Sequence, residues 1–299
     1  MKGRLCWDYR LRMELMQMAI REVSKSVTGT RTVDGAGVSL VRVLGKPDVY
    51  DFDPFLMLDA FDSVDPEDYV KGFPWHPHRG IETVTYLIKG DIEHGDSLGN
   101  SGSIKDGDCQ WMTAGSGIIH QEMPKASPRM LGAQLWVNLP AKDKMCPPKY
   151  RDITDAMIPA VSEGLATIRV ISGSYKGTKG AMEGDYVRPT YLDVLLEPGC
   201  EWIVATPPGN TTFAYIVEGS AEFGPQGSAS IGAKHAVLLG DGDEARVKAG
   251  PGGIRMLFLE AAPLREPIAW GGPIVMNTKD ELRQAFKDLD EGKFIILGH

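Results

Sequence analysis

Short apolar runs separated by turn residues are the feature that most restricts how this chain can fold. Between residues 38 and 260 the runs are rich in β-branched and aromatic side chains, and Gly, Pro, Asn or Asp bounds each of them. Such runs are typical of strands. They cover residues 38–44, 83–88, 133–137, 167–171, 191–196 and 256–259. With 35 glycines and 20 prolines in 299 residues to make the turns, the pattern predicts an all-β sandwich or barrel.

The pattern changes once, near the C-terminus. Thr278 and Glu281 have the spacing of a capping box, in which two side chains satisfy free N–H groups at the start of a helix. Four apolar residues then fall on one helical face, namely Leu282, Ala285, Phe286 and Leu289. We therefore expect a short terminal helix over residues 278–291, packed on a sheet.

An internal echo indicates two similar domains. Residues 83–90 resemble residues 212–219 at an offset of 129, which is much longer than the period of a solenoid repeat. A Pro-rich stretch of mixed charge lies between the two copies. The predicted organisation is an N-terminal extension (1–18), a first barrel (19–145), a linker (146–164) and a second barrel (165–299).

Composition excludes several classes of function. The chain has 32 basic and 40 acidic residues, a net charge of −8, which disfavours direct nucleic-acid binding. It contains no run of 18 apolar residues, so no membrane helix is expected, and charged residues interrupt any secretory signal at the N-terminus. The four cysteines show no Cys-x-x-Cys spacing. We expect a reduced, cytoplasmic protein.

The chemistry of the chain is concentrated in two pairs of residues. His76 and His78 are two residues apart, so on a strand both rings face the same side, and Pro77 between them favours a sheet edge. About forty residues later His120 and Glu122 share the same parity. Two hairpin-linked strands would bring all four groups together. Three imidazoles and one carboxylate suit iron, manganese, nickel or copper better than a closed structural zinc site.

Both segments resemble the pirin family of cupins. The likeness is carried by residues 72–86 and 110–122, and it extends to residues 53–59, 93–99 and 272–277. The resemblance implies two tandem cupin (jelly-roll) β-barrels, of which the first alone holds a metal. The ligands would be His76, His78, His120 and Glu122. The metal would be one divalent ion, usually Fe(II), with Mn, Ni, Cu or Zn as alternatives.

Other glutamate and aromatic positions leave alternatives open. Many other cupins use a glutamate at the position of Glu82 as the ligand, and its parity matches that of the histidines unless a bulge at Gly80 turns it aside. We favour Glu122 as the ligand, with Glu82 holding a ring N–H or a water. Trp111 belongs either to the core or to the wall of a pocket for a planar substrate.

Three further positions have simpler interpretations. Arg79, directly after His78, should point away from the metal and form a salt bridge. His94 lies in a Gly-, Asp- and Ser-rich hairpin, where a hydrogen bond is expected rather than ligation. At the offset of 129, His76 and His78 fall on Ala205 and Pro207. A metal-free second barrel is therefore expected.

The resemblance also suggests a reaction. Some pirins are similar in activity to quercetin 2,3-dioxygenases, which open the central ring of a flavonol such as quercetin with O₂ and release carbon monoxide. In that case Glu122 would accept the proton of the flavonol hydroxyl. The alternative is a metal-dependent, redox-responsive regulatory protein that binds a protein partner.

Overall fold

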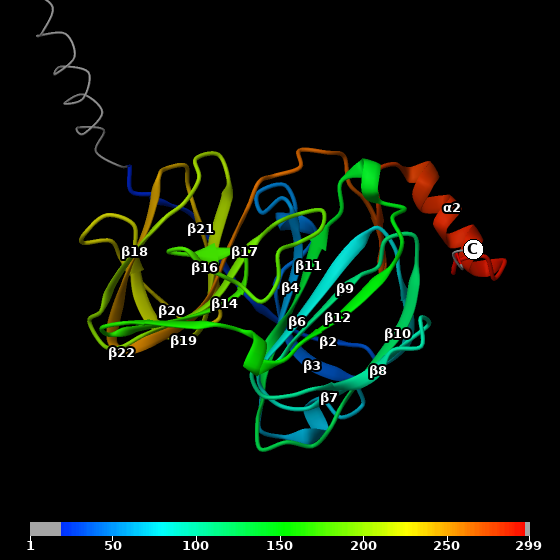
Figure 1. Cartoon of the computed structure of the whole chain (residues 1–299), viewed down its shortest axis with the longest axis horizontal. Coiled ribbons are helices and arrows are strands. Elements are labelled where there is room, and N and C mark those ends of the chain that lie inside the picture. Colours follow the sequence, from blue (N-terminus) through cyan, green and yellow to red (C-terminus); the bar gives the residue numbers. More distant parts are fainter. Residues whose placement is uncertain (1–18, 297–299) are drawn as a thin grey trace, which may run out of the picture.

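The computed structural model describes residues 19–296, and the predicted extension (1–18) lies outside the described residues. The all-β prediction is confirmed: two jelly-roll halves lie side by side, with one α-helix near the C-terminus among the described residues (Figure 1). Two packed sheets build the first half and one folded sheet builds most of the second, and neither half is a closed barrel. Within the described chain, no helix has both the length and the apolar character needed to cross a membrane.

Two antiparallel sheets build the first half. The larger has the order β12-β9-β6-β11-β4-β3-β2, and the smaller has the order β5-β10-β7-β8. The larger sheet consists of β2 (Thr30–Asp34), β3 (Val38–Leu44), β4 (Phe55–Ser63), β6 (Ile81–Lys89), β9 (Cys109–Thr113), β11 (Met130–Asn138) and β12 (Lys149–Ile153). The smaller consists of β5 (Phe73–His78), β7 (Ile92–Asp96), β8 (Ser101–Ile104) and β10 (Ile118–Pro124).

The second half is one nine-stranded sheet that folds over on itself, because the long strand β22 pairs with β17, β18 and β19. Its strands are β1 (Val23–Thr28), β13 (Ala160–Glu163), β14 (Ala166–Ser172), β17 (Thr190–Leu196), β18 (Glu201–Ala205), β19 (Thr211–Phe223), β20 (Ser230–Gly232), β21 (His235–Leu239) and β22 (Glu244–Ala261). Two small hairpins are β15 (Ser174–Tyr175) with β16 (Thr178–Lys179), and β23 (Ala269–Gly271) with β24 (Ile274–Met276). Short 3₁₀ helices cover Lys46–Asp48, Pro66–Asp68, Ala141–Asp143 and Asp155–Met157.

The local predictions hold for strands and helix alike. All six predicted apolar runs lie in strands, and the two copies of the internal echo fall on β6 and β19. The helix α2 (Lys279–Asp290) begins at the predicted capping box, where Thr278 Oγ1 accepts from Glu281 N–H and Glu281 Oε2 accepts from Thr278 N–H. The side chain of Ala285 on its apolar face is buried.

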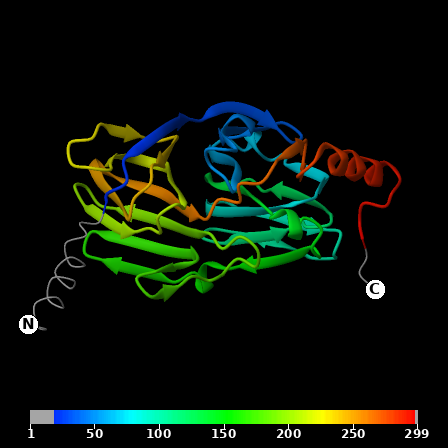
Figure 2. The same cartoon turned by 90° about the horizontal axis from the view of Figure 1, so that it is seen from above.

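The first and the last described segments of the chain each pass from one half to the other. The N-terminal strand β1 pairs with β21 of the second half and then continues into β2 of the first (Figure 2). After β22 the chain returns to the first half, where Ile274, Met276, Ala285 and Phe294 form an apolar cluster with Ile119. The predicted linker contains β12 and β13, each paired to a different half. The domain boundary at residues 146–164 stays a prediction. In the structure the halves exchange segments, because the N-terminal strand pairs with the second half and the C-terminal segment packs on the first.

A shared core joins the halves. The largest apolar cluster includes Val84 and Trp111 from the first half and Tyr191, Phe213 and Leu257 from the second. This continuous core makes the two jelly rolls one packed unit.

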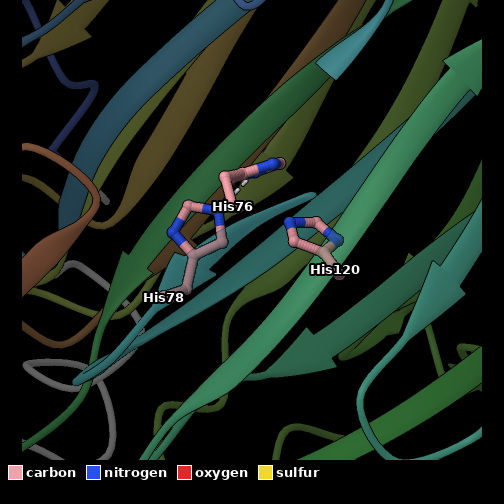
Figure 3. A group of neighbouring side chains, drawn as sticks. All are labelled: His76, His78 and His120. Atoms are coloured by element: carbon pink, nitrogen blue, oxygen red, sulfur yellow. Dashed lines mark hydrogen bonds between the residues drawn. The ribbon is translucent and has the colours of Figure 1, made fainter. Parts of the chain in front are cut away.

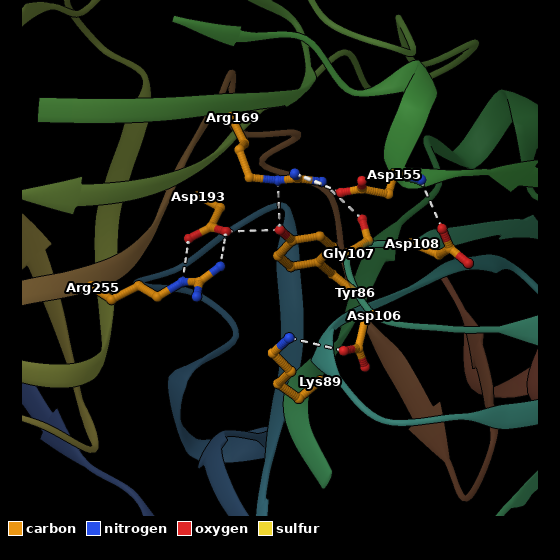
Figure 4. Close-up of polar contacts among 9 residues, drawn as sticks. All are labelled: Tyr86, Lys89, Asp106, Gly107, Asp108, Asp155, Arg169, Asp193 and Arg255. Carbon is orange, nitrogen blue, oxygen red and sulfur yellow. Dashed lines mark hydrogen bonds and ion pairs between the residues drawn. The ribbon is translucent and has the colours of Figure 1, made fainter. Parts of the chain in front are cut away.

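A polar network crosses the same interface (Figure 4). The Tyr86 hydroxyl donates to Asp193 Oδ2 at 2.7 Å and accepts from Arg169 Nε at 3.1 Å. Arg255 donates to both oxygens of Asp193, at 2.9 and 2.6 Å. The buried carboxylate is thus paired and hydrogen-bonded, as burial of a charge requires.

Replacing Tyr86 with Phe should destabilise the protein by about 1–3 kcal/mol, because a donor to a buried carboxylate is lost. The matched control is Tyr215→Phe, in the same core. The Tyr215 hydroxyl is buried and has no hydrogen-bond partner among residues 19–296, so this change should be close to neutral. Urea unfolding of both variants measures the difference. Equal losses of stability would show that the hydrogen bond to Asp193 contributes nothing.

Candidate metal centre

Strands β5 and β10 bring three histidines together at the edge of the smaller sheet. The strands are antiparallel with His120 opposite His76, and His78 lies two residues along the same face as His76. On β10 the residues alternate, so that Ile118, His120 and Glu122 are buried. One ring nitrogen from each histidine lies within 4.8 Å of the others (Figure 3).

The hydrogen bonds of His76 and His78 assign their tautomers. Nδ1 of His76 lies 2.9 Å from the carbonyl oxygen of Pro74, and Nδ1 of His78 lies 3.0 Å from that of Pro273. A carbonyl only accepts, so each Nδ1 carries a proton. The two Nε2 atoms face each other 3.1 Å apart, within hydrogen-bonding distance. A cation coordinated by both Nε2 atoms would replace that contact.

His120 completes the group. Its side chain is fully buried, and neither ring nitrogen has a hydrogen-bond partner within residues 19–296. Its ring centroid lies 4.3 Å from that of His76 and 5.1 Å from that of His78. A buried imidazole without partners is costly unless a ligand satisfies it. The three side chains therefore fit a transition-metal ion, for which neutral imidazole is a preferred ligand.

Burial also keeps these rings in the form that binds metal. Desolvation, with a smaller effect of the neighbouring His76, lowers the pKa of His78 to about 3, although the Pro273 carbonyl partly opposes this. Desolvation and the other histidines lower the pKa of His120 well below its ordinary value. Both imidazoles are thus neutral near pH 7, and no proton competes with a metal for them.

Glu122 is buried on the same face of β10 as His120, but its carboxylate is held by neutral donors. Oε1 accepts from Thr85 Oγ1 at 3.1 Å, and Oε2 accepts from the Gln134 side-chain amide at 2.8 Å. Its oxygens are not part of the group of ligand atoms within 4.8 Å of one another. The structure thus places Glu122 along the strand from His120, with both oxygens engaged.

The structure does not bring Glu82 and Trp111 to the histidines, and for Trp111 this is the core position that the sequence analysis gave as one of two alternatives. The chain changes sheet at Gly80, which has a φ of +79° and whose missing Cβ would lie 2.0 Å from the Val275 carbonyl oxygen. The alternation of faces counted from His78 along β5 therefore does not predict which face a residue of β6 occupies. Glu82 accepts from Thr113 Oγ1 at 2.6 Å, and Trp111 is buried in the core between the halves.

The environment of Glu82 favours its neutral form. Burial raises its pKa to about 7, and the hydroxyl of Thr113 limits the rise. The Trp111 indole N–H also lowers this pKa, although it makes no hydrogen bond of ordinary geometry with Glu82. Glu82 is a buried carboxyl on the face of the larger sheet that points away from the histidines.

His94 and Arg79 have the hydrogen bonds expected of them. Nε2 of His94, on β7, lies 3.2 Å from Asp96 Oδ2, and its Nδ1 lies 2.7 Å from the Gln110 side-chain nitrogen. Its ring stacks on Tyr150. Arg79 forms an ion pair with Asp288 on α2 at 2.6 Å. Both ring nitrogens of His94 thus have hydrogen-bond partners, although its ring centroid is only 5.5 Å from that of His120.

A cavity of about 970 Å³ opens onto His76 and His78. Its walls include residues that the sequence analysis did not single out, among them Arg42, Met57, Asp59, Gln134, Trp136 and Trp270. Trp136 packs its ring edge-on against His78, with centroids 5.0 Å apart, and lies 5.7 Å from Trp270. Gln134 and Trp136 are two residues apart on β11 and point to the same face. That spacing is the sequence signal that could have identified this wall. Trp270 gave no such signal, because it comes from the returning C-terminal segment.

Comparison with known proteins decides the family. Residues 37–137 match the family model described as Pirin, and residues 191–295 match that of the Pirin C-terminal cupin domain. The chain belongs to the pirin family. A pirin-like protein of Caulobacter vibrioides is 44% identical, over 93% of this chain and 100% of that protein. A pirin-like protein of Solanum lycopersicum is 40% identical, over 91% and 92%.

A solved structure has the same fold. The crystal structure of quercetin 2,3-dioxygenase from Acinetobacter baumannii superposes with a TM-score of 0.84 at 34% identity, covering 92% of this chain and 99% of that one. Together with the two family models, this likeness confirms the tandem cupin architecture of this pirin.

Replacing Glu82 with Gln should remove part of the pH dependence of stability. Between about pH 4.5 and pH 7 the folded protein keeps the proton that the unfolded chain releases, so the carboxyl destabilises the fold increasingly as pH rises through this window. The expected gain of the variant over the wild type is about 2–3 kcal/mol larger at pH 8 than at pH 4.5. Urea unfolding of metal-free protein at both pH values measures it.

The matched control is Glu197→Gln, at an exposed position, which should change stability equally at both pH values. If Glu82→Gln retains the wild-type pH dependence, the carboxyl is not held neutral by burial. Metal content should be the same in both variants, since neither side chain contacts the histidines.

Proposed function

We propose that this pirin is a metal-dependent dioxygenase that opens the ring of a flavonol such as quercetin with O₂. The observation that carries the proposal is the meeting of three imidazoles at a large cavity whose walls include Trp136 and Trp270. The likeness to the quercetin 2,3-dioxygenase of Acinetobacter baumannii supports the same reaction class. A volume of about 970 Å³ lies at the upper end of the range for small-molecule pockets.

In this proposal His76, His78 and His120 hold one ion, most simply Fe(II), and Glu122 is the fourth ligand or a base beside it. When bound, the metal supplies a Lewis acid that orients the substrate hydroxyl and polarises it for reaction with O₂. Carbonyl acceptors fix the rings of His76 and His78, so that their Nε2 atoms stay aimed at the same point. Such fixing of ligand orientation raises metal affinity.

Glu122 takes the proton of the flavonol hydroxyl in this scheme. Its two oxygens already accept hydrogen bonds from Thr85 and Gln134, which keep the carboxyl group oriented. Trp136 and Trp270 offer flat apolar surfaces for a planar substrate at the same cavity. The ammonium of Lys46, another residue of the cavity wall, lies over the Trp270 ring, 5.6 Å from its centroid.

Purified protein loaded with Fe(II) should consume quercetin in air and lose this activity when a chelator removes the metal. The measurement is the decay of the flavonol absorbance band, together with the release of carbon monoxide. No chelator-sensitive decay would reject the dioxygenase. In that case the regulatory alternative is tested by recovery of a stoichiometric partner in only one oxidation state of the metal.

The Glu122→Gln variant separates proton transfer from substrate binding. It should lower kcat by about 100-fold or more, as expected for loss of a general base, while anaerobic quercetin binding persists. Glu82→Gln is the matched control and should retain kcat, because Glu82 lies on the opposite face of the sheet. Equal activity of the two variants would exclude Glu122 as the base.

A further inference from the structure

The end of strand β5 is tied to the returning C-terminal segment beside the metal ligand His78. The Val275 N–H donates to the Arg79 carbonyl at 3.1 Å, and Arg79 forms a parallel bridge with Ile274. Two residues before Val275, the Pro273 carbonyl accepts from Nδ1 of His78 at 3.0 Å. The orientation of the His78 ring therefore depends on where this segment lies against β5.

One buried ammonium joins the two segments. Lys144 Nζ donates to the Gly80 carbonyl at 2.7 Å, to the Val275 carbonyl at 2.9 Å and to Asn138 Oδ1 at 2.5 Å. Gly80 lies two residues after His78 on the chain. An ammonium has three N–H donors and no acceptor. The number of oxygens around Lys144 thus matches the number of its donors.

The two backbones are in close contact at this point. A Cβ at Gly80 would lie 2.0 Å from the Val275 carbonyl oxygen and 3.1 Å from Cδ of Lys144. No side chain other than hydrogen fits there, so the lysine stem packs directly on the turn that ends β5. The lysine therefore contacts both segments that set the position of the His78 ring.

The surroundings of Lys144 do not otherwise favour a charge. Burial lowers the pKa of Lys144 to about 7, although the charges of Glu266 and Glu281 oppose this. None of its three hydrogen bonds goes to a carboxylate. A buried charge costs free energy unless its hydrogen bonds are satisfied, and an apolar side chain would fill the space at a lower cost. The three oxygens explain the cation, because an apolar side chain could not donate to them.

We propose that Lys144 is a positioning residue of the metal centre. By holding Val275 against Gly80, it keeps the Pro273 carbonyl at Nδ1 of His78, so that Nε2 of this ring stays aimed at the ion. The proposal rests on the proposed function only for the presence of an ion at the three histidines. The effect on the His78 ring belongs to the metal-free protein as well.

The first test observes the His78 ring in metal-free protein by ¹⁵N NMR at pH 6, where Lys144 keeps its proton. Wild-type His78 should carry its proton on Nδ1. Lys144→Met keeps the length of the side chain but removes its donors, so the Nδ1 proton should exchange faster and both tautomers should be populated. Lys144→Gln, which keeps two donors on a shorter side chain, is the milder variant if Lys144→Met does not fold. Unchanged His78 signals in the folded variant would overturn the proposal.

The second test measures Ni(II) affinity at the same pH. Loss of the group that orients a metal ligand typically weakens binding 10–100-fold, so Lys144→Met should weaken it by about 10-fold or more. The matched control is Tyr86→Phe, which loses a buried hydrogen bond at the interface of the halves and should bind like the wild type. Wild-type affinity in Lys144→Met would contradict the proposal. An equal loss in both variants would show that Lys144 acts only through overall stability.

The two tests also separate this proposal from the proposed function. If the wild type binds metal but consumes no quercetin, the proposed function fails, and both measurements still decide whether Lys144 positions His78. If the wild type binds no ion at the three histidines, the state of the His78 ring in the metal-free variants decides it alone.

Discussion

Two imidazole nitrogens held 3.1 Å apart are the constraint on which the rest of this site depends. The backbone carbonyls of Pro74 and Pro273 accept from Nδ1 of each ring, which leaves the two Nε2 atoms facing each other. The fully buried ring of His120 adds two nitrogens that have no hydrogen-bond partner within residues 19–296. A cation between the three rings would be coordinated by a nitrogen of each.

The exchange of terminal segments explains how the chain holds this arrangement. Pro273 belongs to the segment that returns from the second half, so the ring of His78 is oriented by residues almost 200 positions away. The same segment is anchored by Lys144, whose ammonium donates to the carbonyls of Gly80 and Val275 at 2.7 and 2.9 Å. Arg79 adds an ion pair with Asp288 and packs over the Phe294 ring. The C-terminal segment that follows the second half is thus part of the support of the first-half site.

Sequence reasoning succeeded where one strand or one helix decides the outcome. The six apolar runs, the capping box at Thr278 and the shared faces of His76 with His78 and of His120 with Glu122 follow from local periodicity. It was incomplete where the chain changes sheet. The sequence allowed a bulge at Gly80 to turn Glu82 aside but not the position that Glu82 then takes, which is beside Thr113 and not beside a histidine ring. Trp270 and Pro273 reach the cavity through tertiary packing, which periodicity does not encode.

Anomalous diffraction from crystals of the protein loaded with iron or nickel tests the central claim most directly. One peak per chain is predicted among His76, His78 and His120, at about 2.1 Å from a nitrogen of each ring, and the same map shows whether Glu122 has left Thr85 and Gln134 to join it. A fully loaded sample with no peak among these rings, or with its metal bound elsewhere, would contradict the claim.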